Sequence, residues 1–95
     1  MGLKEAYLEK REAELHEWDA ELKLLEAKAA KFKAEATVQY YEDLRSLRAK
    51  HKTAHDKLNE LRQATGEAWN TIKVAVENAW LDLKVGLKSA AAKLK

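Results

Sequence analysis

Two histidines in the middle of the chain are the residues best suited to hold a metal ion. His51 and His55 are four positions apart, and Asp56 follows the second of them. On a helix, two imidazoles at this spacing share a face and could supply two ligands to zinc or nickel. The remaining ligands would have to come from another chain, so the pair is a weak metal candidate. The alternative is that His51 is a polar residue in an apolar seam, where it helps to fix helix register.

Two adjacent tyrosines, Tyr40 and Tyr41, precede a series of basic residues. Aromatic stacking combined with phosphate contacts is the chemistry of single-stranded nucleic-acid binding. The basic side chains are spread over several helical faces, however, and Glu42 and Asp43 interrupt them. The formal net charge is only +2. We therefore do not expect nucleic acid to be a partner. The basic residues are Arg45, Arg48, Lys50, Lys52 and Lys57.

No arrangement of residues indicates catalysis. The chain has no cysteine, two serines (Ser46 and Ser89) and no glycine-rich loop. Its carboxylates are numerous but are expected on exposed helix faces, where little would shift their pKa values. A helix without a concave pocket also lacks what small-molecule chemistry requires. We expect neither an enzyme nor a cofactor, resident metal or small-molecule substrate.

The composition indicates one small all-α domain. The 95 residues include no proline and three glycines, and helix-forming residues dominate. With 36% of its residues charged and no cysteine for a disulfide, a single chain has little with which to stabilise a core. These features predict an elongated coiled coil that associates with itself as a homo-oligomer.

The apolar residues of segment 1–36 follow a heptad, with alternating spacings of three and four along one helical stripe. After residue 36 the spacings become four, four and three, which predicts a stutter and a middle segment over 37–65. The expected oligomer seam of these two segments consists of Leu15, Trp18, Leu22, Leu25, Phe32, Tyr40, Leu44, Leu47, Leu58 and Leu61.

The segment 66–95 repeats every eleven residues. Glu67-Ala68-Trp69-Asn70 is followed eleven positions later by Asn78-Ala79-Trp80-Leu81. Eleven residues make three turns at about 3.67 residues per turn, so one face returns with almost no drift. The seam here is predicted to consist of Trp69, Ile72, Val76, Trp80, Leu83 and Leu87.

Gly66 is the one expected point at which this helical chain could turn. The seam keeps its phase across Gly66, which favours a continuous helix that tolerates a glycine at a cost of about 1 kcal/mol. Uninterrupted, such a helix would be about 140 Å long. The alternative is a helical hairpin in which residues 67–94 lie antiparallel against 38–64.

The Trp-containing face also suggests an alternative role as an amphipathic helix that binds an anionic membrane surface. Lysines flank the apolar side chains, and Trp suits the headgroup region. The first thirty residues lack the apolar core of a signal peptide, and no run approaches a membrane span, so we expect a cytoplasmic protein. The flanking lysines are Lys73, Lys84, Lys88, Lys93 and Lys95.

Several short stretches of the sequence form a recognisable set: Tyr41-Glu42-Asp43-Leu44, Lys57-Leu58-Asn59-Glu60-Leu61, Ala68-Trp69, Ile72-Lys73, Ala79-Trp80 and Asp82-Leu83-Lys84. Together they resemble a family of small bacterial coiled-coil proteins associated with stress response and first named from cyanobacteria. The resemblance implies a cytoplasmic, non-enzymatic helical protein and carries no catalytic or binding residues. One departure is Asn70-Thr71, where family members tend to have acidic residues.

Overall fold

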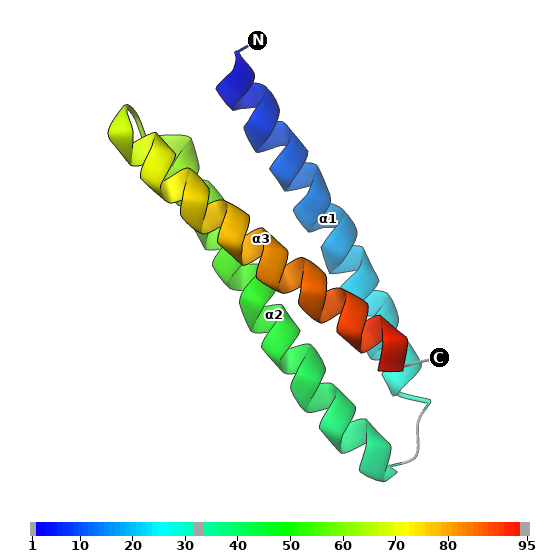
Figure 1. Ribbon diagram of the computed structural model, residues 1–95. Coiled ribbons are helices and arrows are strands. Elements are labelled where there is room, and N and C mark those ends of the chain that lie inside the picture. The colour runs from blue at the N-terminus through cyan, green and yellow to red at the C-terminus, as the bar shows by residue number, and fades with distance from the viewer. Residues whose placement is uncertain (1, 32–33, 94–95) are drawn as a thin grey trace.

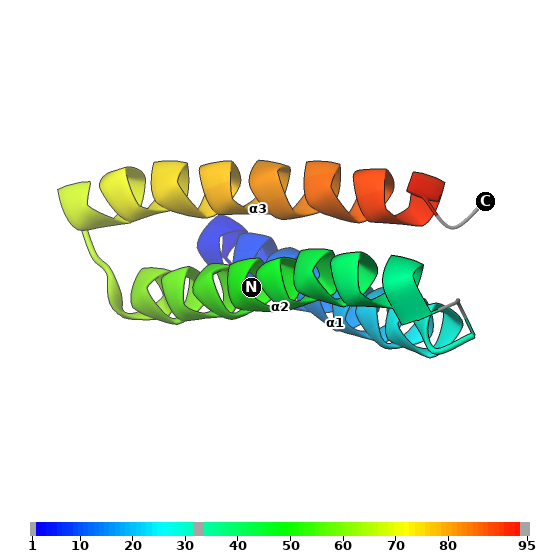
Figure 2. The same ribbon diagram turned by 90° about the horizontal axis from the view of Figure 1, so that it is seen from below.

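The chain folds into an elongated bundle of three helices in antiparallel order (Figures 1 and 2). The computed structural model describes residues 2–31 and 34–93. The helices are α1 (Leu3–Ala29), α2 (Ala34–Gln63) and α3 (Glu67–Lys93), and the described residues contain no strand. The bundle measures 51 × 21 × 17 Å, which confirms the predicted all-α, elongated architecture. A single helix of about 140 Å is thereby excluded.

Helix α1 confirms the heptad pattern of the first segment but ends earlier than predicted. Its buried residues are Leu15, Leu22, Leu25 and Ala29, all on one stripe. The N–H of Lys31 then bonds to the carbonyl of Lys28 at 3.1 Å, a tightened last turn. The prediction of one helical segment that continues through residue 36 was therefore wrong. Phe32, a predicted seam residue, lies outside the described residues.

The change of period after residue 36 accompanies a reversal of the chain. The sequence around residues 30–33 carries no glycine or proline, so nothing local requires a turn there. A stutter within one helix and a turn between two helices both reset the phase of the apolar stripe. Tertiary packing decided between them, because folding back lets the stripe of α2 cover that of α1.

The turn between α2 and α3 confirms the predicted hairpin at Gly66 and shows that the expectation of a continuous helix was wrong. Gly66 adopts φ +58°, in the left-handed region. The two helices then run antiparallel, and the Tyr40 hydroxyl donates to the carbonyl of Ala90 at 2.7 Å. The seam keeps its phase across Gly66, but this did not exclude a turn there, since each helix of a hairpin buries its own stripe.

The predicted seam residues form the core of a single chain. Trp18 and Ile72 are partly buried, and the other described members are buried. Leu22, Leu58, Leu61 and Leu83 are among the largest fully buried side chains. The stripe that the sequence assigns to contacts between chains is thus already covered within one chain. The buried seam residues are Leu15, Leu22, Leu25, Tyr40, Leu44, Leu47, Leu58, Leu61, Trp69, Val76, Trp80, Leu83 and Leu87.

Replacing Gly66 by alanine should destabilise the bundle by about 1 kcal/mol, because an L side chain at positive φ is strained. In a domain of this size the midpoint of thermal unfolding should fall by about 4–8 °C. Gly66→Asn is the matched control and should lose less, since asparagine tolerates this conformation. Equal melting temperatures for Gly66→Ala and the parent chain would contradict the role of the turn.

Candidate functional site

His51 lies between α1 and α2 and makes a hydrogen bond across them. Its Nε2 lies 2.9 Å from the carbonyl oxygen of Leu15, and because a carbonyl only accepts, Nε2 donates. His55 is exposed, and its Nδ1 lies 3.4 Å from Asn59 Nδ2. Within the described ranges 2–31 and 34–93, no three histidine or carboxylate side chains gather as a metal site would require. The observed contact favours the polar-seam interpretation of His51.

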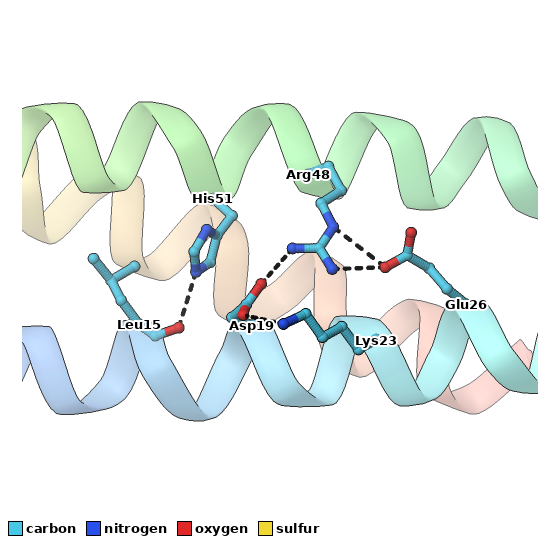
Figure 3. Close-up of polar contacts among 6 residues, drawn as sticks. All are labelled: Leu15, Asp19, Lys23, Glu26, Arg48 and His51. Atoms are coloured by element: carbon cyan, nitrogen blue, oxygen red, sulfur yellow. Dashed lines mark hydrogen bonds and ion pairs between the residues drawn. The ribbon is translucent and has the colours of Figure 1, made fainter.

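The guanidinium of Arg48 joins α2 to two carboxylates of α1 (Figure 3). Its terminal nitrogen lies 2.7 Å from Oε1 of Glu26, and Nε donates to the same oxygen at 3.2 Å. The other terminal nitrogen donates to Asp19, which Lys23 also approaches at 3.2 Å. The hydrogen bond from Arg48, followed by that from Lys23, lowers the pKa of Asp19 to about 2. The cluster orients α1 on α2, and Asp19 is ionised at neutral pH.

The basic residues of the middle segment are largely paired with acids. Lys50 contacts Asp82 on α3 at 3.3 Å, and Arg62 contacts Glu12 on α1 at 2.7 Å. Tyr40 is buried, so its ring is not available for stacking on a base. These contacts give the basic residues a structural role in the monomer. The absence of nucleic acid as a partner stays a prediction.

The Trp face of α3 is covered by α1 and α2 together, and α2 packs against α3 more extensively. Trp80 packs against Trp18 with ring centroids 6.2 Å apart, and Trp69 meets Tyr7 edge-on at the same separation. Lys73 lies over the ring of Tyr7, 4.9 Å from its centroid. The apolar face proposed for a membrane surface is therefore the packed face of the bundle. Lipid could reach it only if α3 separated from the other two helices.

A second, unpredicted apolar stripe lies on the opposite side of α3. Val74, Leu81 and Val85 are 59%, 62% and 58% exposed. Their spacings of seven and four place them on one side of the helix. The sequence contains a signal for this stripe, because Val74 and Val85 occupy equivalent positions of the eleven-residue repeat. We call these three residues, with the neighbouring Glu77 and Lys84, the outer face of α3.

A cleft of about 380 Å³ opens between α1 and α3 beside the outer face. Trp18 and Trp80 contribute aromatic surface to it. The indole Nε1 of Trp80 is buried without a hydrogen-bond partner among the described residues. α1 and α3 thus leave this cleft between them, whereas α2 packs against both helices. The charged and apolar residues that complete the lining are Arg11, Glu14, Glu77, Leu81 and Lys84.

Asp19 should make the stability of the bundle depend on acidity. Its pKa is about 2 when folded, against an ordinary value of 3.8, so the ionised carboxylate stabilises the fold above about pH 4. That contribution should be lost as the pH falls from about 4 to 2. Thermal melts should therefore show Asp19→Asn below the parent chain at neutral pH, with the difference closing near pH 2.

Arg48→Gln provides the matching test. Removing the guanidinium should raise the pKa of Asp19, measured by NMR titration of its carboxyl, because Arg48 supplies the largest lowering effect. An unchanged titration of Asp19 would show that the contact in Figure 3 does not persist in solution.

In comparisons with known proteins, no family model, curated protein or solved structure matches the chain. None of the helices in the described ranges is long and apolar enough to cross a membrane. The features that bear on function are consequently those of the molecule itself: a buried apolar core, ion pairs between helices, and an apolar outer face on α3.

Proposed function

We propose that the protein is a non-enzymatic helical bundle that acts by associating with copies of itself or with other helical partners. The resemblance in its sequence further supports a bacterial, cytoplasmic stress-response role. The observation that carries the proposal is the outer face of α3. Three aliphatic side chains remain exposed in line on a helix whose other side already contributes Trp69, Val76 and Trp80 to the core. Aligned exposed apolar residues are typical of interaction surfaces.

The side chains whose pKa values depart from the ordinary range support a non-enzymatic role. The pKa values of Asp19 and Glu12 are lowered through hydrogen bonds to Arg48 and Arg62, respectively. The pKa of Tyr40 is raised by burial. Each of these shifts moves the group further from neutrality. General acid–base catalysis needs the opposite, a pKa near the working pH.

The energetics favour a modest affinity. Burying the exposed part of three aliphatic side chains on each of two copies would contribute about 5–11 kcal/mol, at 1.5–3 kcal/mol for each fully buried side chain. Association itself costs about 4–15 kcal/mol. Because these ranges overlap, we expect a reversible, concentration-dependent assembly and not a permanent one.

An anionic membrane surface is the alternative partner. Lys84 and Lys88 lie on α3 near the exposed Leu81 and Val85, which favours contact with acidic headgroups. The support is weaker than for self-association, because Trp69 and Trp80, the residues best suited to the interface, are buried in the bundle.

Sedimentation equilibrium from micromolar to near-millimolar protein tests the proposal. We expect the mean mass to rise from 10.8 kDa towards a whole multiple of it as the concentration increases. The far-ultraviolet circular dichroism should stay constant, because the monomer is already folded. A mass of 10.8 kDa at every concentration would contradict self-association. Binding to anionic vesicles at low salt would then support the membrane alternative.

A further inference from the structure

The outer face of α3 has the pattern of a surface that can pair with itself. Leu81 lies in the middle, with Val74 seven residues before it and Val85 four residues after it. Glu77 and Lys84 stand along the same stripe, on the flank that borders the cleft with α1. Neither of these charged residues makes an ion pair within the described parts of the chain.

An antiparallel arrangement of two copies satisfies the whole face in one register. If two α3 helices cross face to face with a two-fold axis near Leu81, each Leu81 lies opposite the partner's Leu81. With the axis between residues 80 and 81, Glu77 lies opposite the partner's Lys84. Val74 and the partner's Val85 are then about two residues out of register, or roughly 3 Å along the helix axis, which is within the reach of packed side chains. All three pairs are centred within about two residues of Leu81, and the two-fold axis makes each charged contact occur twice.

The position of the charges favours the antiparallel over the parallel arrangement. In a parallel two-fold pair, the flank with Glu77 and Lys84 would lie on opposite sides of the interface in the two copies, so Glu77 would not meet the partner's Lys84. The antiparallel pair keeps this flank on the same side in both copies, which allows the oppositely charged residues to meet. The order of charge along α3 therefore selects direction as well as register.

The neighbouring cleft gives the central side chain room to pack. Leu81 lines this cleft together with Trp18, Trp80 and Glu14. A partner's leucine that enters between α1 and α3 would contact aromatic surface as well as Leu81. The interface would then extend beyond one pair of helices towards α1, as a stable contact requires.

We propose that a second copy of this chain docks antiparallel on the outer face of α3, with the two-fold axis beside Leu81 and ion pairs between Glu77 and the partner's Lys84. This inference rests on the proposed self-association and specifies its surface, direction and register.

Cross-linking through a single cysteine tests the position of the axis. The chain contains no cysteine, so Leu81→Cys can form a disulfide only between two copies. At the axis of closely packed helices the two Cα atoms can approach within the roughly 7 Å that a disulfide allows. Ser89→Cys is the control: it is exposed on the same helix. In the proposed register its two copies would be roughly 24 Å apart.

Mild oxidation should convert Leu81→Cys to a covalent dimer and leave Ser89→Cys largely monomeric, as seen on a non-reducing gel. Equal cross-linking of the two variants, or cross-linking of Ser89→Cys alone, would overturn the proposed register.

Charge reversal tests the direction and the pairing. Glu77→Lys and Lys84→Glu should each weaken the dissociation constant of the dimer at least about tenfold, because each creates two like-charge contacts. The double variant Glu77→Lys/Lys84→Glu restores both pairs and should return close to the parent affinity. Weakening in the double variant as large as both single effects combined would overturn the proposal. Thermal melts at low concentration confirm that each variant folds.

The outcomes separate this inference from the function on which it rests. A parent chain that stays monomeric at every concentration overturns both. A parent chain that self-associates while Leu81→Cys fails to cross-link and the charge reversals have no effect overturns only the docking face. If vesicles of anionic lipid bind the monomer and Leu81→Asp abolishes that binding, the outer face serves a lipid surface instead.

Discussion

The fold depends on α2 being covered from both sides. α2 packs against α1 and α3, whereas α1 and α3 meet less closely and leave a cleft between them. Leu58 and Leu61 on α2 are essentially inaccessible to solvent, at 1% and 0% exposure. An isolated helix of this charge content would gain little from its own hydrogen bonds, so its stability comes from covering this stripe. Both chain reversals serve that end.

Polar contacts fix how the helices sit once the apolar stripes are buried. Arg48 reaches two carboxylates of α1, and His51 donates to a backbone carbonyl of the same helix. Exposed ion pairs contribute little stability individually. Their arrangement, however, is specific to one alignment of α1 on α2, because a shift by one helical turn would move Arg48 towards one acid and out of reach of the other. The neighbouring contact between Tyr40 and Ala90 plays the same part between α2 and α3.

Folding back changes what self-association can mean for this chain. If the Trp-containing stripe were exposed in a long helix, association would be obligatory, because that stripe would have no other cover. In the bundle the stripe is covered internally, and the outer face of α3 is a smaller apolar surface that stays exposed. Association through Val74, Leu81 and Val85 can then be reversible and can respond to protein concentration or salt.

The local pattern of the sequence determined the helical class, the residues of the core stripe and the possible turn at Gly66. Each depends on neighbours along the chain: helix propensity, a period near 3.6, and the freedom of glycine at positive φ. Nearly every predicted seam residue, from Leu15 to Leu87, is buried or partly buried. The residue types at Trp69 and Trp80 were enough to mark a packed face, but not to identify its partner.

Only the tertiary structure decided that the chain reverses after Ala29, that α1 covers Trp80, and that Arg48 joins Asp19 to Glu26. No glycine or proline marks the first turn, and a seam that keeps its phase is equally compatible with a straight helix and a hairpin. The choice arises from contacts between residues far apart in sequence, which a one-dimensional period does not encode. The outer face of α3 could be identified only from the structure for the same reason. Which apolar residues stay exposed is known only once the residues of the core are known.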